Sequence, residues 1–217
     1  MRKKTTYTGV STDSRIIKKG NLFIALKGPN YDGHNFVLSA LHKGASSAVV
    51  SINIPNIKNK KALIRVADTL LYLQNLAHIH RQKLRTKVIA VTGSSGKTTT
   101  KDMIYSVLSQ DGLTLKTQEN LNNEIGVPLT LLKIEKKHKY AVIEMGMRNT
   151  GEIKELAKIA RPNISVLTNI GEAHLAGLKT KKNIAKAKSE IFNFLNKEDF
   201  AVLKAVDHFF EYLKIKK

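Results

Sequence analysis

Cysteine is absent from the 217 residues of this sequence. Its absence excludes disulfide bonds, thiolate metal sites and cysteine nucleophiles. The sequence also has no run of about 18 apolar residues, so we expect no membrane-spanning helix. The first four residues, Met1–Lys4, are basic, but threonines follow where a signal peptide requires an apolar run. Together these absences predict a cytoplasmic protein.

Acidic residues are few. The chain has 17 Asp and Glu against 37 Lys and Arg, which gives a formal net charge of +20. One explanation would be nucleic-acid binding. The excess is mostly lysine, however, and it is spread along the chain without an arginine-rich arm or interleaved aromatic residues. We therefore expect no nucleic-acid partner, and we note that a basic surface favours an anionic small substrate.

Hydrophobic patterning divides the chain into two α/β parts. In the first part, short apolar runs predict strands at 21–26, 48–50 and 62–66, with a helix from about 36 to 44. Asp68 stands where it can cap a helix that runs to about residue 83. The polar run that follows, residues 81–87, marks the expected boundary. We therefore predict an N-terminal domain at 1–84 and a central domain at 85–217.

The second part alternates strands and helices more regularly. Its apolar runs predict four strands and three helices, followed by a short helical end: strands at 88–91, 140–144, 164–167 and 200–203, and helices at 97–108, 152–160 and 183–194. Buried strands that alternate with helices are typical of a doubly wound parallel sheet. The predicted fold class is therefore α/β, with a small N-terminal α/β domain before a doubly wound, mainly parallel nucleotide-binding domain.

The most specific motif is Thr-Gly-Ser-Ser-Gly-Lys-Thr-Thr, between a predicted strand and a predicted helix. Its glycines allow the backbone N–H groups to face a phosphate, and the helix N-terminus adds partial positive charge. Lys97 would reach the β- and γ-phosphates, and Thr98 would offer its hydroxyl to Mg²⁺. This is a short form of the P-loop, because Val91 stands where the general motif carries its first glycine. It predicts ATP and Mg²⁺ as cofactors, with a binding loop made of Thr92, Gly93, Ser94, Ser95, Gly96, Lys97, Thr98 and Thr99.

Further segments resemble the Mur ligase family of peptidoglycan synthesis. Four lie in the second part, at 120–132, 143–153, 168–175 and 187–192, and three in the first, at 11–15, 20–28 and 32–36. The first part is similar to the domain that holds the UDP end of the substrate. The resemblance covers nearly the whole chain in matching order. It implies an ADP-forming ligase that joins D-alanyl-D-alanine to UDP-N-acetylmuramoyl-tripeptide through an acyl phosphate.

The resemblance also implies roles for single residues. The expected catalytic set is Lys97, Glu144, His174 and Lys188, of which the last three and Thr98 would hold Mg²⁺. Lys188 would do so as a carbamate, which requires a neutral amine and hence a lowered pKa. The implied substrate contacts are Ser14, Arg15, Lys27, His34, Asn122 and Asn123. Simpler roles stay open: the two asparagines could cap a helix at 125–132, and Lys188 could be a surface lysine.

Two departures from the family pattern affect the expected activity. The family chain is about twice as long, and the run Leu203–His208 stands where the family usually has an Asn-Ala-Asp-Asp-like segment. We therefore expect an incomplete central domain and an inactive chain in isolation, and we expect a monomer. Two alternative functions remain: a folylpolyglutamate synthase of the same superfamily, and a P-loop NTPase that uses hydrolysis to drive conformational change or nucleic-acid handling.

Overall fold

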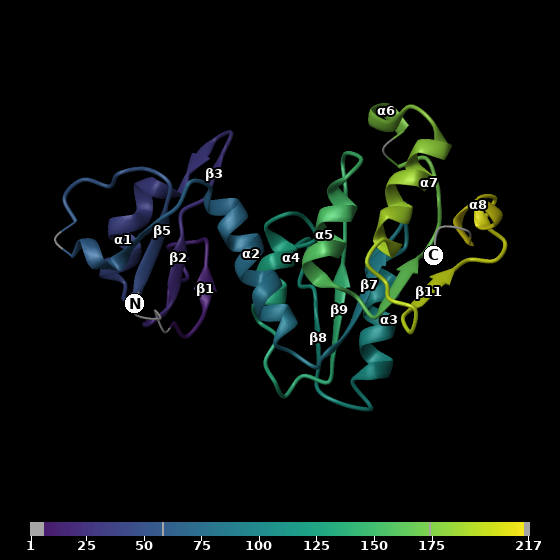
Figure 1. Cartoon of the computed structure of the whole chain (residues 1–217), viewed down its shortest axis with the longest axis horizontal. Helices are drawn as coiled ribbons and strands as arrows, with labels where there is room; N and C mark the ends of the chain where they lie inside the picture. The colour runs from purple at the N-terminus through teal and green to yellow at the C-terminus, as the bar shows by residue number, and fades with distance from the viewer. Residues whose placement is uncertain (1–6, 58, 174, 215–217) are drawn as a thin grey trace. The chain divides into compact units, whose positions relative to one another are not determined.

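The computed structural model describes residues 7–57, 59–173 and 175–214 (Figure 1). The chain divides into two compact units, Met1–Leu76 and Ala77–Lys217, which are described separately below. Within the described residues, no helix is both long enough and apolar enough to cross a membrane.

The first unit is built on a four-stranded parallel sheet with the order β1-β2-β5-β6. Its strands are β1 (Val10–Ser11), β2 (Leu22–Ile24), β5 (Ser47–Val50) and β6 (Leu63–Arg65). A small antiparallel hairpin joins β3 (Lys27–Gly28) to β4 (Tyr31–Asp32), and it leads into the turn η1 (Gly33–Phe36) and helix α1 (Val37–His42). A second short turn, η2 (Lys60–Ala62), precedes β6. Phe23, Val37 and Ala48 form the centre of this unit's core.

Helix α2 (Thr69–Gln82) begins after Asp68. The Asp68 carboxylate accepts hydrogen bonds from the backbone N–H groups of Leu70 and Leu71, at 2.7 and 2.9 Å. These N–H groups have no acceptor within the helix, so the carboxylate satisfies them and sets the start of α2. The predicted cap is therefore confirmed.

The second unit contains a five-stranded sheet in which every pair is parallel, with the order β11-β10-β7-β9-β8. Its strands are β7 (Lys87–Thr92), β8 (Thr114–Lys116), β9 (Tyr140–Glu144), β10 (Ile164–Leu167) and β11 (Phe200–Leu203). The helical segments are α3 (Lys97–Leu108), α4 (Gly126–Leu131), α5 (Glu152–Ala160), α6 (Leu175–Leu178), α7 (Lys181–Ser189), η3 (Glu190–Phe192) and α8 (Phe210–Lys214).

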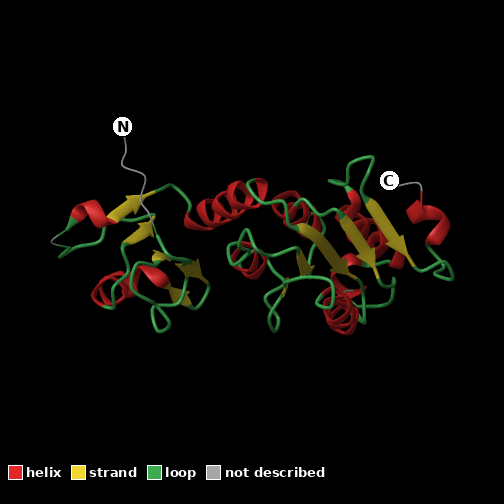
Figure 2. Cartoon of the chain, turned by 90° about the horizontal axis from the view of Figure 1, so that it is seen from below, coloured by secondary structure: helices red, strands yellow, loops and turns green. Residues whose placement is uncertain are grey.

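Helices cover both faces of this sheet (Figure 2). On one face, Ile104 and Leu108 of α3 pack against Ile89, Val91 and Val142. On the other face, apolar residues of α4, α5, α7 and α8 share one core with the alternate residues of the strands. Because successive strand residues point to opposite faces, a sheet covered on both sides needs apolar residues at nearly every position. The predicted doubly wound α/β fold is confirmed for this unit.

The structure differs from the predicted elements in the helix expected at 183–194. Helix α7 begins earlier, at Lys181, because the Thr180 hydroxyl accepts a hydrogen bond from Asn183 N. The chain then tightens at Ser189 into the 3₁₀ turn η3. Strand β8 is a second difference, because it was not predicted. Its three residues, Thr-Leu-Lys, form too short a pattern to be recognised as a strand.

Candidate active site

The strand order brings three functional segments to one edge of the sheet. Strand β7 lies between β9 and β10 in the sheet. After β7 the chain forms β8 and β9 on one side of it, and it then crosses to form β10 on the other side. All three strands are parallel, and their carboxyl ends therefore meet at the same edge, with Gly93, Glu144 and Thr168 beside one another in the fold. This point of reversal is where open α/β sheets bind ligands.

The loop after β7 takes a backbone course that depends on its glycines. A Cβ atom on Gly93 would lie 1.8 Å from the Thr168 Oγ1 atom, so no larger residue fits there without displacing its neighbour. Gly96 has φ +75° and forms the N-cap of α3. The Lys97 ammonium turns back over the loop and donates to the Gly93 carbonyl oxygen at 3.0 Å. This conformation is consistent with the predicted phosphate-binding loop.

The predicted phosphate-binding segment, residues 92–99, is called the phosphate loop below. A second loop, residues 168–171, supports it, and we call this second loop the bracing loop. Asn169 accepts from both serines: its carbonyl oxygen from Ser94 N and its Oδ1 from Ser95 N, each at 3.1 Å. Thr168 Oγ1 donates to the Ser95 carbonyl oxygen at 2.7 Å. Gly171 N donates to Ser94 Oγ at 2.8 Å. The phosphate loop is therefore held from one side by a network that sequence reasoning did not identify.

Glu144 ends strand β9 and is only 1% exposed. Its Oε1 accepts from the Asn122 side-chain amide at 2.9 Å, and its Oε2 accepts from the Thr98 hydroxyl at 3.0 Å. The Lys101 ammonium lies 3.8 Å from the same Oε2. A carboxylate and a hydroxyl oxygen side by side at the first turn of a P-loop helix are hard ligands of the type that Mg²⁺ prefers.

Lys188 is a buried lysine on α7, with 1% of its surface exposed. Its ammonium donates to the Gly93 carbonyl oxygen at 3.1 Å. Burial, reinforced by the charge of Lys97, lowers the pKa of Lys188 from 10.5 to about 8. The alternative that Lys188 is a surface lysine is therefore wrong. The neighbouring Lys186, by contrast, is exposed.

His174, the remaining predicted metal ligand, lies outside the described residues. In the part of the chain that the structure describes, no group of three or more His, Cys, Asp or Glu side chains is arranged to hold a metal ion. Of the residues predicted to hold Mg²⁺, the structure brings Thr98 and Glu144 together, and it places Lys188 against Gly93 of the phosphate loop.

The predicted substrate loop at 120–132 has two asparagines with different contacts. Asn123 Oδ1 accepts from Ile125 N at 3.2 Å and from Gly126 N at 2.9 Å, just before α4 begins. It therefore has the capping role that the sequence left open. Asn122 instead directs its amide to Glu144 and lies tightly against Gly146, where an added Cβ atom would meet Asn122 Oδ1 at 2.9 Å.

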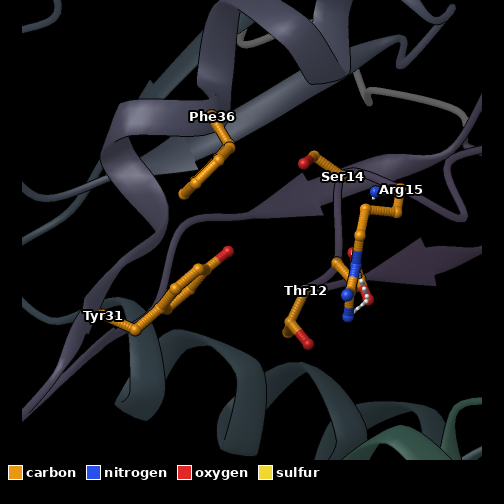
Figure 3. A pocket seen from close by; sticks show the side chains of 6 residues that line it. Thr12, Ser14, Arg15, Tyr31 and Phe36 are labelled. Carbon is orange, nitrogen blue, oxygen red and sulfur yellow. Dashed lines mark hydrogen bonds and ion pairs between the residues drawn. The ribbon is translucent and has the colours of Figure 1, made fainter.

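The first unit contains a separate cavity of about 430 Å³, within the usual range for small-molecule sites. Its lining residues are Thr12, Asp13, Ser14, Arg15, Tyr31 and Phe36. The Tyr31 and Phe36 rings are stacked with their centroids 5.4 Å apart (Figure 3). Arg15 is exposed, and its guanidinium binds the Asp13 carboxylate with Nε at 3.0 Å and Nη2 at 2.7 Å. These hydrogen bonds hold the pKa of Asp13 below its ordinary value.

Two other predicted substrate contacts of this unit lie apart from the cavity lining. Lys27 is exposed on β3. His34 is only 5% exposed, and its Nδ1 lies 2.6 Å from Asp32 Oδ1 while its Nε2 accepts from Ser51 N at 3.0 Å. The imidazole thus joins the hairpin to the residue that follows β5. Of the predicted set in this unit, Ser14 and Arg15 are the two that share a cavity.

Two family models match the chain. The model described as Mur ligase family, catalytic domain, matches residues 6–82, and the Mur ligase middle domain matches residues 91–217. The chain belongs to the Mur ligase family.

Relatives and solved structures extend this family assignment. The UDP-N-acetylmuramoyl-tripeptide--D-alanyl-D-alanine ligase of Bacillus subtilis is 47% identical over 90% of this chain and 43% of its own length. The Escherichia coli ligase of the same name is 42% identical over 92% of this chain and 44% of its own. A crystal structure of MurF from Acinetobacter baumannii has a TM-score of 0.88 at 41% identity, covering 95% of this chain and 45% of that one.

The MurF ligase of Thermotoga maritima, solved in complex with ADP, has a TM-score of 0.87 at 32% identity, covering 100% of this chain and 50% of that one. The Mur ligase chain described here therefore spans about half the length of the relatives it matches, or somewhat less.

Lys101 is the residue of this Mur ligase chain that sequence reasoning missed most clearly. It is only 3% exposed, and its ammonium lies between Glu144 and Asp102, at 3.8 and 3.6 Å. The available signal was its spacing, because a residue four positions after Lys97 lies on the same face of α3. Lys97 and Lys188 contact the Gly93 carbonyl oxygen, and Lys101 lies beside Glu144. This edge of the sheet therefore carries three lysines, an environment that favours a polyanion.

Proposed function

We propose that this chain carries the UDP-substrate-binding and ATP-binding parts of a ligase that adds D-alanyl-D-alanine to UDP-N-acetylmuramoyl-tripeptide. The relatives that carry this name support the proposed reaction. The observation that carries the ATP site is the convergence of Lys97 and Lys188 on Gly93 O, beside the Thr98–Glu144 pair. A cytoplasmic location and a monomeric state belong to the same proposal.

In the proposed complex, the N–H groups of the phosphate loop bind the phosphates of ATP. Lys97 leaves the Gly93 carbonyl oxygen and contacts the β- and γ-phosphates. Thr98 and Glu144 would hold Mg²⁺, which would neutralise charge on the phosphate oxygens. Asn122 and Lys101 keep the Glu144 carboxylate in place through its two oxygens.

The reaction needs no nucleophilic side chain from the protein. The tripeptide carboxylate attacks the γ-phosphorus, which forms an acyl phosphate and releases ADP. The amine of the dipeptide then attacks the carbonyl carbon, forms the amide and releases phosphate. The residues of this chain contribute by holding the anions in line and by supplying positive charge in a partly buried site.

Lys188 supports this proposal through its pKa. At a pKa of about 8, roughly a tenth of the Lys188 side chains are neutral amines at pH 7, and the neutral amine is the form that reacts with CO₂. We propose that Lys188 is carbamylated and then offers carboxylate-type oxygens close to Gly93. Labelling with ¹³CO₂ should give a carbamate signal in NMR that Lys188→Met removes and Lys186→Met retains.

The UDP end of the substrate is proposed to bind in the cavity of the first unit. The stacked Tyr31 and Phe36 rings offer an aromatic surface to a uracil, and Ser14 offers polar atoms. Arg15 suits a diphosphate because its planar guanidinium forms paired hydrogen bonds. The bond between Arg15 and Asp13 would keep that side chain directed along the cavity wall until the substrate competes for it.

The direct test is calorimetric titration of the whole chain with MgATP and, separately, with UDP-N-acetylmuramoyl-tripeptide. We expect Lys97→Met to weaken MgATP binding more than tenfold, because one charge-assisted contact is lost, and to leave UDP-peptide binding unchanged. Lys186 is an exposed lysine of the same unit, so Lys186→Met should change neither the MgATP affinity nor the UDP-peptide affinity. Equal MgATP affinity in wild type and Lys97→Met would contradict the proposed nucleotide site.

A further inference from the structure

Asp207 lies in the segment between β11 and α8, and its half-buried carboxylate makes contacts in two directions. Its Oδ2 accepts a hydrogen bond from Ile170 N in the bracing loop at 2.9 Å. Its Oδ1 accepts from Phe209 N at 2.9 Å, immediately before α8. One side chain therefore ties the segment that follows the edge strand β11 to the bracing loop.

From these contacts we propose that Asp207 is a positioning residue of the nucleotide site. It would act through the backbone of the bracing loop and without touching the nucleotide. The part that concerns nucleotide affinity rests on the ATP site proposed above, whereas the part that concerns the order of the phosphate loop does not.

The backbone around Asp207 is itself well fixed, which allows the carboxylate to act as an anchor. Asp207 N donates to the Lys204 carbonyl oxygen at 3.0 Å, and the Asp207 carbonyl oxygen accepts from Phe210 N at 2.9 Å. Leu213 of α8 is 2% exposed and belongs to the core of this unit. A charged acceptor on a fixed backbone forms a stronger bond to a loop N–H group than a neutral one does.

The bond to Ile170 is placed where it can influence the phosphate loop. Ile170 stands between Asn169 and Gly171, which bond to Ser95 and Ser94 respectively. A shift of the Ile170 backbone would therefore move both neighbours and disturb the N–H groups of both serines. There is little room for such a shift at Gly93, because Thr168 of the bracing loop packs closely against Gly93.

The experiment compares Asp207→Ala and Asp207→Asn with Asp199→Asn in the full chain. Asp199 lies beside the other end of β11, where it accepts from Asn163 Nδ2 at 3.2 Å and from Asn196 N at 2.7 Å. Its substitution should destabilise the same unit without reaching the phosphate loop. Three quantities are measured: amide hydrogen exchange of the nucleotide-free protein, the dissociation constant for MgADP, and the melting temperature.

We expect Asp207→Ala to speed exchange at the Ser94, Ser95 and Gly171 amides about tenfold, because one charged acceptor of the network is lost. MgADP binding should weaken about fivefold, as only part of this loss reaches the ligand. Asp207→Asn should lie between wild type and Asp207→Ala, since its amide oxygen can still accept from Ile170 N. Asp199→Asn should lower the melting temperature and change neither local exchange nor MgADP affinity.

The same measurements can overturn the proposal. If Asp207→Ala and Asp199→Asn give the same exchange rates at these three amides, Asp207 has a general structural role only. If Asp207→Ala does not fold, the comparison of Asp207→Asn with Asp199→Asn decides the same question. If wild type binds no MgADP, the proposed nucleotide site fails, while exchange in the nucleotide-free protein still decides the bracing role.

Discussion

Lys97 and Lys188 donate hydrogen bonds to the same atom, the carbonyl oxygen of Gly93, from 3.0 and 3.1 Å. They come from different elements, the first residue of α3 and the last turn of α7. Two ammonium groups that share one acceptor repel each other, and the burial of Lys188 strengthens the effect. A bound polyphosphate would relieve this repulsion by giving Lys97 an anionic partner, and carbamylation would relieve it by removing the charge of Lys188.

The first prediction concerns the pH dependence of stability. The pKa of Lys188 is about 8 in the folded chain and 10.5 without these contacts. Between these values the unfolded chain holds a proton that the folded chain has released, so the free energy of unfolding rises with pH. In CO₂-free buffer, wild type should gain about 1 kcal/mol relative to Lys188→Met between pH 8 and pH 9. Denaturant unfolding at both pH values measures this change in the free energy of unfolding. The control variant Lys186→Met should show the same pH dependence as wild type.

The second prediction concerns two glycines of one loop. Gly93→Ala should lower the free energy of unfolding by about 3 kcal/mol, because its Cβ atom would displace Thr168. It should also abolish MgATP binding. Gly96→Ala should cost only about 1 kcal/mol, since nothing lies within 4 Å of its added Cβ atom and only the left-handed φ is unfavourable. Equal losses of stability in chemical denaturation would show that the contact with Thr168 is not limiting.

The third prediction concerns the buried pair formed by Glu144 and Lys101. Glu144→Ala should destabilise the chain by about 3 kcal/mol, because the buried Lys101 ammonium then keeps only the half-buried Asp102, at 3.6 Å, as a carboxylate partner. Lys101→Met in the same background should recover at least half of that loss. The exposed pair Glu155–Lys158 is the control, and Glu155→Ala should cost less than about 0.5 kcal/mol. A double variant no more stable than Glu144→Ala would argue against this electrostatic explanation.

The fourth prediction concerns the cavity of the first unit. Arg15→Ala should weaken binding of UDP-N-acetylmuramoyl-tripeptide about tenfold, and Arg15→Lys should give an intermediate loss because it keeps the charge but not the planar fork. Calorimetry with the full chain measures both. Lys27→Ala provides the comparison, since Lys27 is also a predicted contact but does not line the cavity. If Lys27→Ala lost more affinity for the UDP-peptide than Arg15→Ala, the proposed site would move to the β3–β4 hairpin.

Local patterns in the sequence were sufficient to predict most of the second unit. The apolar runs of β7, β9 and β10 and the helices α3 and α5 were predicted within one residue of their observed ends. The phosphate loop was predicted for a similar reason, because glycine, lysine and threonine at this spacing, between a strand and a helix, are typical of one backbone shape. Its binding of phosphate stays a prediction. Such signals depend on neighbours along the chain, and the sequence contains them completely.

The tertiary structure alone decided which of the predicted residues meet. The strand order places Gly93, Glu144 and Thr168 at one edge, although they lie up to 75 positions apart. It also buries Lys188 and Lys101, lowers the pKa of Lys188, and joins Asp207 to the bracing loop. Burial, and the electrostatic effects that follow from it, depend on contacts between distant segments, which periodicity along the chain does not encode. The sequence by itself thus determined the residue types of the site and its loop, while their arrangement around Gly93 came from the packing of α3 and α7 on the sheet.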